Sequence, residues 1–467
     1  MNRKVLWIIG CGVILFSQIN LSFVWSDATD INKLSLEKFI GLASKQDTRF
    51  EQILIDRLGL QYRKALGLPA GEWVLVLKSK YNFLFDPDDE AIENTVSLSR
   101  LFPYTGTEIS GAYSSTLSAN SRDISSEFEL AISQPIAENA LGKNTRLLGK
   151  IIGLETEVAN FQIIEAYEDY LATLIQLYYN WYSAYENLNT ARNSYNENLK
   201  LLDNIKERQK FKIALPVDVN KVSLQVAIKK EALISLENKY DEYLNLIKQS
   251  IRQEDQAKLQ PENPLAYENV QINFNSDYLK FNTQSRTAKI LKMLEDKTSF
   301  EVNKYANELL PSINIIAGYL QQGSEYNIKD PEQTVYAGLS FDWPMSRVVE
   351  KARFETAKIE LKKTKLSSEN IHLKLHTDLK NLNEQIIKEK ELIAIAEDKI
   401  IFAQSIVEDD QKNYSLGRIT LNDLIDEVNK LEDNKFNKIF HEIQLKRLII
   451  EWLRLNDQLI KQNDLGS

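Results

Sequence analysis

Hydrophobic residues recur at spacings of three and four over most of the chain, a pattern that indicates amphipathic helices. The longest stretches predict one helix from about 137 to 211 and another from about 345 to 413. At ~1.5 Å per residue, these helices are expected to be roughly 110 and 100 Å long, which no globular core accommodates. Apolar spacing sustained over this length is typical of coiled coils, so the helices are expected to bury their apolar stripes against neighbours.

Shorter helical patterns flank the two long ones, at about 34–66, 217–257, 278–310 and 421–460. Long and short helices meet at two turns, near 211–219 and 413–426. In the second turn, Gly417 suits the left-handed residue that ends a helix, Thr420 suits an N-cap, and Asp423 stands where a capping carboxylate is useful. Each turn is therefore predicted to close a long helical hairpin.

Between the helices lie runs of strand-forming residues, at 72–85, 95–102, 107–117, 127–134, 312–321 and 334–343. Pro135 and Pro344 mark the two changes from strand to helix, and each is predicted to stand in the first turn of a long helix. Strands of about 9 to 11 residues can cross a bilayer when tilted. Because six strands are too few to close a barrel, closure requires several chains. A soluble sheet domain on a coiled-coil stalk would explain the strands but not their place between such long helices.

The order helix, strands, long helix, turn, shorter helix occurs twice, which predicts two structural repeats, 27–260 and 261–467. Residues 1–26 read as a secretory leader, with Arg3 and Lys4 before an apolar run that is shorter than the ~20 residues of a membrane-spanning helix. Cys11 lies within that run rather than at its end, so acylation is not expected. Without the two basic residues of the leader, 55 basic residues stand against 66 acidic ones, and the net charge of −11 opposes general binding to nucleic acid.

This order of elements, together with four short segments, resembles the TolC-type outer-membrane efflux proteins. The segments are Ala131–Ile136, Gly338–Pro344, Tyr414–Gly417 and Asp423–Asp426. The resemblance implies a homotrimer in the outer membrane, with a β-barrel continued by an α-helical barrel in the periplasm. It also implies docking to a periplasmic adaptor protein and an inner-membrane pump, in a tripartite efflux or type I secretion system. Such a protein is a passive duct, and its cargo is chosen by the adaptor and the pump.

The resemblance places a periplasmic gate at the tips, with Tyr414 and Arg418 locking against a neighbouring helix and Asp218 as a candidate acceptor. Asp423 and Asp426 share one helix face, so in a trimer they could form a ring of carboxylates at the pore entrance, or simply a solvated helix start. Two departures from the family stand out. Arg418 is one position earlier than the usual gate arginine, where this chain has Ile419, and the first tip looks about two residues shorter than the second.

Other chemistry is weakly supported. His372 and His376 are four residues apart, but no third ligand stands near them, so no metal site is predicted. The acidic run 86–90 suits a solvated loop better than a calcium site, and the tyrosines and tryptophan of 178–185 suit a helix interface. No nucleophile with a base and no phosphate-binding glycine loop is found, so neither an enzyme nor a cofactor is expected. The alternative to an export duct is a secreted coiled-coil structural or adhesive protein.

Overall fold

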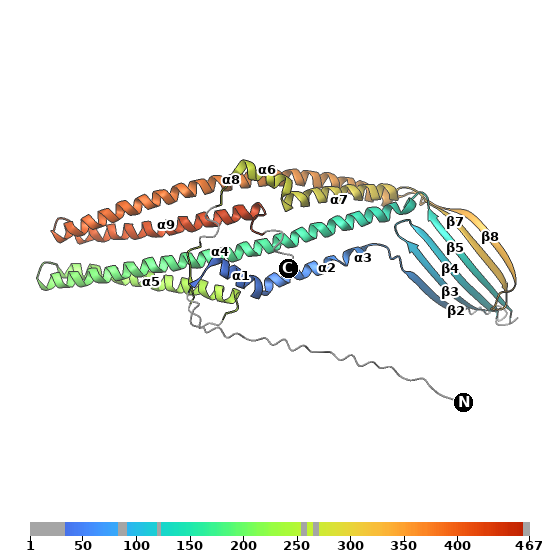
Figure 1. The fold of residues 1–467 in the computed structure, drawn as a ribbon, viewed down its shortest axis with the longest axis horizontal. Helices are drawn as coiled ribbons and strands as arrows, with labels where there is room; N and C mark the ends of the chain where they lie inside the picture. The colour runs from blue at the N-terminus through green and yellow to red at the C-terminus, as the bar shows by residue number, and fades with distance from the viewer. Residues whose placement is uncertain (1–32, 83–90, 119–122, 254–258, 265–269, 461–467) are drawn as a thin grey trace, which may run out of the picture.

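The computed structural model describes residues 33–82, 91–118, 123–253, 259–264 and 270–460. The molecule is elongated, with a twisted β-sheet at one end and two helical hairpins that reach the other end (Figure 1). The predicted leader and the predicted acidic loop 86–90 lie outside the described residues.

Two helical hairpins make up most of the length, as the hydrophobic spacing predicts. The first consists of α4 (Lys143–Lys210) and α5 (Pro216–Ser250), and the second of α8 (Val348–Ser415) and α9 (Leu421–Leu455). Both long helices have 68 residues, about 100 Å, and both short ones have 35. Helix α5 ends before the predicted position near 257. The two-repeat division of the chain stays a prediction.

The leading helical stretch of each half is broken where one unbroken helix is predicted. The first half has α1 (Leu36–Gln46), α2 (Thr48–Leu60) and α3 (Arg63–Gly67), and the second has α6 (Phe274–Gln284) and α7 (Arg286–Glu308). The break between α1 and α2 falls at Asp47 and the break between α6 and α7 at Ser285, both in extended conformation, whose side chains accept the backbone N–H of Arg49 and Ala288. These residues compete with the helix for backbone hydrogen bonds, so each ends one helix and caps the next.

All six predicted strands form one antiparallel sheet in the order β2-β3-β4-β5-β7-β8. They are β2 (Trp73–Asn82), β3 (Ala91–Phe102), β4 (Thr107–Ser118), β5 (Ile124–Pro135), β7 (Ser312–Ser324) and β8 (Lys329–Asp342). Pairing is continuous from β2 to β8, so among the described residues the free edges of this sheet are β2 and β8.

The prolines at the strand-to-helix junctions do not open the long helices, contrary to the prediction. Pro135 is the last residue of β5, and Pro344 follows β8, whereas the helices begin only at Lys143 and Val348. The chain is still extended at Pro135 because that residue is paired with Asn314 in the sheet.

Left-handed residues make the two junctions instead. Gly142 (φ 71°) precedes α4, and a Cβ atom there would lie 2.3 Å from the carbonyl oxygen of Tyr104. Arg347 (φ 43°) precedes α8, and its buried guanidinium donates to the carbonyls of Glu308 (3.1 Å) and Leu310 (2.8 Å) at the end of α7. The Arg347 side chain therefore satisfies backbone acceptors that the helix end leaves without partners.

The largest core lies where α4 passes the leading helices and the two-residue strands β1 (Lys33–Leu34) and β6 (Gln260–Pro261). Tyr178 is fully buried there, donates its hydroxyl to the Leu34 carbonyl (2.6 Å) and accepts the Glu262 N–H (3.0 Å). The prediction that the aromatic group of 178–185 packs in a helix interface is thus confirmed for Tyr178, Tyr179 and Trp181.

A buried ionic cluster joins α4, α7 and the segment after α9. Arg286 pairs with Glu168 and, at 3.0 Å, with Asp457. Glu168 also accepts the backbone N–H of Leu459 (2.9 Å). Burial raises the pKa of the neighbouring Glu165, Asp457 raises it further, and Arg286 lowers it.

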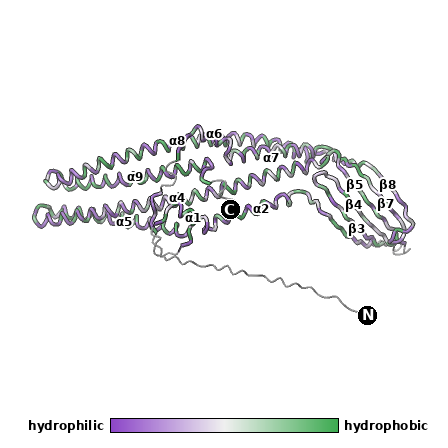
Figure 2. The backbone as a smooth tube through the Cα atoms, in the orientation of Figure 1, coloured by the Kyte–Doolittle hydropathy of each residue, from purple (hydrophilic) through white to green (hydrophobic). Residues whose placement is uncertain are grey.

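Helices of the described part of the chain are not apolar enough over a sufficient length to cross a membrane. Figure 2 shows that hydrophilic positions recur along the long helices.

Candidate functional site: the helical tips and the two-faced sheet

The two hairpin tips have the same backbone path. Five residues, 211–215 and 416–420, link the helices, so the prediction of a shorter first tip is wrong. The left-handed residue is Lys212 (φ 57°) in one tip and Gly417 (φ 72°) in the other. In both tips the N–H of the following residue donates to the carbonyl five residues earlier, from Ile213 to Arg208 and from Arg418 to Asn413, each at 2.9 Å.

Asp218 and Asp423 occupy equivalent places and cap the outgoing helices. Asp218 accepts the N–H of Leu215 (3.1 Å), and Asp423 accepts the N–H of Thr420 (3.0 Å). The Thr420 hydroxyl donates to Asp423 at 2.7 Å, and the predicted Thr420 N-cap is confirmed. These bonds, the hydroxyl first, hold the pKa of Asp423 below its usual range. Both carboxylates thus have a structural use in the helix start.

Tyr414 lies between the two hairpins. Its ring is covered by the Arg208 guanidinium of α4, 4.8 Å from the ring centre, and it packs on the apolar cluster of the first tip. Partial burial raises the pKa of the Tyr414 hydroxyl, the Arg208 charge lowers it, and the Asp218 charge raises it. The contact that ties Tyr414 to the neighbouring helix is therefore a cation–π contact with Arg208, whereas the prediction was that hydrogen bonds and ion pairs of Tyr414 and Arg418, with Asp218 as a candidate acceptor, hold the tip.

Arg418 and Asp426 are exposed. Within the described ranges, neither side chain has a hydrogen-bond or ion-pair partner. Asp423 and Asp426 lie in the first turns of α9, and both are exposed.

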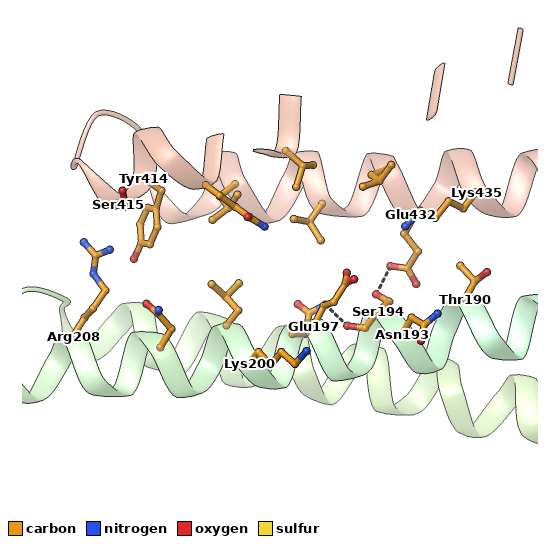
Figure 3. A pocket seen from close by; sticks show the side chains of 18 residues that line it. Thr190, Asn193, Ser194, Glu197, Lys200, Arg208, Tyr414, Ser415, Glu432 and Lys435 are labelled. Atoms are coloured by element: carbon orange, nitrogen blue, oxygen red, sulfur yellow. Dashed lines mark hydrogen bonds between the residues drawn. The ribbon is translucent and has the colours of Figure 1, made fainter. Parts of the chain in front are cut away.

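A groove of about 490 Å³ runs along the tip end between α4 and the hairpin of α8 and α9 (Figure 3). Arg208 and Tyr414 meet at the tip end of this groove, and Ser194 and Glu432 are hydrogen-bonded across it further up. The Ser194 hydroxyl donates to Glu432 at 2.8 Å, and the ammonium of Lys229 pairs with the same carboxylate. The side chains of Lys229 and Glu432 are only 12% and 9% exposed.

A second polar contact crosses the hairpins nearby, where the Gln225 amide donates to Asn429 at 2.7 Å. The residues of both contacts were not predicted from the sequence. Lys229 and Glu432 lie 203 positions apart within ordinary amphipathic helices, so no local pattern distinguishes them from surface charges.

At the other end of the molecule, the register of the sheet sorts its side chains onto two faces. One face is apolar across all six strands, with Leu75 paired to Leu98, Leu77 to Val96, Leu130 to Tyr319, and Tyr319 to Val335. Most of these side chains and several others of that face are exposed: Leu75, Leu77, Val96, Leu98, Ile109, Leu130, Ile132, Ile315, Val335, Leu339 and Phe341.

The opposite face carries mostly polar side chains, since neighbouring residues in a strand point to opposite sides. It includes Lys78, Lys80, Glu93, Thr95, Ser97, Ser99, Glu108, Ser110, Ser114, Thr116, Glu127, Glu129, Gln322 and Glu332. A sheet with one apolar and one polar face, neither covered by other described residues of the chain, suits a wall between lipid and water.

Comparison with solved structures gives matches along nearly the whole chain. CusC, described for its transmembrane channel formation, matches with a TM-score of 0.70 and 8% identity over 90% of this chain and 91% of that one. The outer-membrane protein VceC of Vibrio cholerae matches with a TM-score of 0.68 and 10% identity, over 90% of this chain and 95% of VceC. The CmeC outer-membrane channel of Campylobacter jejuni matches with a TM-score of 0.65 and 13% identity, over 92% of this chain and 87% of CmeC.

The chain has the TolC-type fold. At these identities the likeness concerns the fold alone. Scans against family models and against curated protein sequences gave no match.

The TolC-type fold accounts for the positions of the quoted segments. Ala131–Ile136 and Gly338–Pro344 lie at the base of the sheet, where strands lead into long helices, and Tyr414–Gly417 forms the second tip. His376 packs edge-on against Phe274 and Tyr278, at 5.6 and 4.8 Å between ring centres. No cluster of three or more metal-binding side chains occurs in the part of the chain that the structure describes.

Proposed function

We propose that this protein is the outer-membrane channel of a tripartite efflux or type I secretion system, assembled as a homotrimer. Its sheet forms part of a β-barrel in the outer membrane, and its helices form part of a periplasmic helical barrel that acts as a passive duct. The observation that carries the proposal is that the chain is an open slab, with unpartnered apolar surface on both of its edges.

The helical layer has a fixed order. Near the tips, α4 packs on α5 and α9, and α8 packs on α9, while nearer the sheet α7 lies between α4 and α8 (Figure 1). Helix α8 therefore forms one edge throughout, and α5 with α2 and α3 forms the other.

Both edges of this layer expose regular apolar stripes. On α8, Ile359, Leu366 and Leu373 repeat every seven residues and are 66%, 51% and 68% exposed. On the opposite edge, the exposed residues are Ile55, Leu58, Tyr62 and Leu66 of α2–α3 and Leu224, Ile228 and Ile234 of α5. Different surfaces at the two edges suit head-to-tail association, which forms a ring when the rotation closes. Spacing by seven is the pattern that a neighbouring helix covers.

The tips are the end proposed to face the adaptor and pump. The first tip exposes Phe211, Ile213, Leu215 and Val217, at 74%, 65%, 64% and 49%. Apolar side chains so exposed at the end of a hairpin suit a protein partner. The gate consists of the contacts between the hairpins, which are Tyr414 with Arg208 and Lys229 with Glu432, and the proposed pore-entrance carboxylates are Asp423 and Asp426.

The test is membrane fractionation followed by electrophoresis without heating. The full chain is expected in the outer-membrane fraction, as a trimer that dissociates on heating. Replacing Leu373 with Glu should abolish the trimer, because it places a charge in the apolar stripe of α8. Lys412→Glu is the control, since Lys412 is comparably exposed on the same helix but outside the stripe. Recovery of the unaltered chain as a soluble, elongated monomer would refute the proposal.

A planar bilayer then tests the entrance. Replacing Asp423 and Asp426 together with Asn is expected to keep the fold, because an Asn side chain at position 423 keeps an oxygen that can accept the Thr420 N–H. Cation preference and block by multivalent cations should both weaken. Unchanged selectivity would rule out the entrance role of these carboxylates and leave the duct itself in place.

A further inference from the structure

The hairpin of β2 and β3 has no counterpart in the second half of the chain. Strands β4 and β7 begin at 107 and 312, helices α4 and α8 at 143 and 348, and α5 and α9 at 216 and 421, always 205 positions apart. Helices α1 and α6 begin at 36 and 274, which is 238 apart. The first half thus holds 33 extra residues (238 − 205), enough for the hairpin and a turn.

This extra hairpin continues the main sheet in full register. Its ten-residue strand β2 pairs along its whole length with β3, and β3 pairs along its whole length with β4. Leu75 and Leu77 extend the apolar face, while Lys78 and Lys80 extend the polar face. A hairpin that left the wall to form a flap in water would need no such agreement with the faces of the other strands.

We infer that the β2–β3 hairpin is a part of the barrel wall and that its outer edge, β2, pairs with β8 of a second copy of this chain. The inference rests on the proposed function. Three copies of a six-stranded sheet then close a barrel of eighteen strands, of which the three extra hairpins supply six.

The two edges suit each other as partners. The strand direction reverses at each of the five antiparallel pairings across the sheet, so β2 and β8 run in opposite directions and β8 of one copy meets β2 of the next antiparallel. Both strands also expose apolar side chains on the same face, Leu77 at 69% and Val335 at 82% among them. Edge pairing would remove the unpaired backbone groups that a sheet leaves at its ends.

Strand number sets the width of a barrel, because the diameter grows roughly in proportion to it. Barrels of about 16 to 18 strands enclose a water-filled channel in their interior. The extra hairpin would therefore give this duct a wide opening to the outside, lined in part by Lys78 and Lys80.

Single cysteines test whether β2 lines that opening. Val76 lies on the polar face of β2, level across the sheet with Ser97 of β3 and Ala112 of β4. Leu77 is its neighbour on the apolar face. The full-length variants Val76→Cys, Ala112→Cys and Leu77→Cys are placed in planar bilayers and treated with a charged, membrane-impermeant methanethiosulfonate. The unaltered protein is treated as the control for Cys11, which lies in the predicted leader.

Modification is expected to reduce the conductance of the Val76→Cys and Ala112→Cys channels by a similar fraction and to leave Leu77→Cys unchanged. A response of Ala112→Cys without one of Val76→Cys would overturn the inference and leave the duct standing. A response of Leu77→Cys equal to that of Val76→Cys would also overturn it, because both faces of the hairpin would then meet water. Failure of every chain, altered or not, to form channels would overturn the proposed function as well.

Discussion

The buried pair of Lys229 and Glu432 offers the sharpest test of the proposed gate. Replacing Lys229 with Met removes the ammonium but leaves the Glu432 carboxylate in a site where its side chain is 9% exposed, with the Ser194 hydroxyl as its remaining donor. Breaking a buried pair in this way typically costs about 3–5 kcal/mol. Separation of the hairpins would relieve that cost, because it admits water to the carboxylate.

A bias of about 3 kcal/mol corresponds to roughly a hundredfold change in an equilibrium, at about 1.4 kcal/mol for each tenfold. Lys229→Met is therefore expected to shift the tips strongly toward the open state. In planar bilayers, the measured conductance of the resting channel should rise. The double variant Lys229→Met with Glu432→Leu should return toward the resting conductance, because it leaves no charge unpaired.

The matched control is Lys210→Met, which breaks the exposed pair of Lys210 and Glu207, whose side chains are 69% and 61% exposed. An exposed pair contributes little, so no change in conductance is expected. The reasoning fails if Lys229→Met conducts like the unaltered channel, or if the double variant stays as open as the single one.

Other predictions concern stability, measured by thermal unfolding in detergent. Arg286→Met should lower the stability by about 3–5 kcal/mol, because it strands the buried Glu168 carboxylate, and Arg286→Lys should recover part of the loss. The pKa of Glu165 is raised in the folded state, so its contribution to stability is full below the unfolded pKa and is lost as pH rises through the folded pKa. The Glu165→Gln variant should thus have a higher unfolding temperature than the unaltered chain at pH 7, and this difference should vanish near pH ~4. A difference in unfolding temperature that is the same at both pH values would contradict this. Gly142→Ala should cost more than the ~1 kcal/mol of a left-handed alanine, since its Cβ would meet a carbonyl oxygen, whereas Gly417→Ala should cost about that amount; equal losses would be the contrary result.

Much of the fold could be predicted because its elements are long and regular. The apolar spacing located both hairpins, and the second tip was placed from the left-handed preference of Gly417 and the cap at Thr420. In the first tip, Lys212 takes the same left-handed conformation, which lysine does not favour and which the sequence therefore does not predict. Judged from sequence, that tip therefore looked shorter than it is.

Predictions failed where tertiary contacts override local preference. Pro135 fits the first turn of a helix, but pairing with the neighbouring strand keeps it extended, and the junction forms at Gly142, where the chain closely approaches another backbone segment. The polar contacts between the hairpins could not be predicted either, because they join helices far apart in sequence. Tyr414 was identified as a contact residue, but its partner Arg208 was not.

The uncovered edges of the sheet have a consequence for how a newly made chain matures. Strands β2 and β8 hold backbone donors and acceptors that nothing in the described part of the same chain satisfies, beside exposed apolar side chains such as Leu77 and Val335. An isolated copy is thus prone to pair with unrelated strands, and its lifetime depends on how soon it meets other copies. Its helical hairpins can form from local contacts, whereas in the proposed trimer the sheet is complete only after assembly. Maturation should therefore depend on chain concentration, and any slow step in production should lie at association rather than at helix formation.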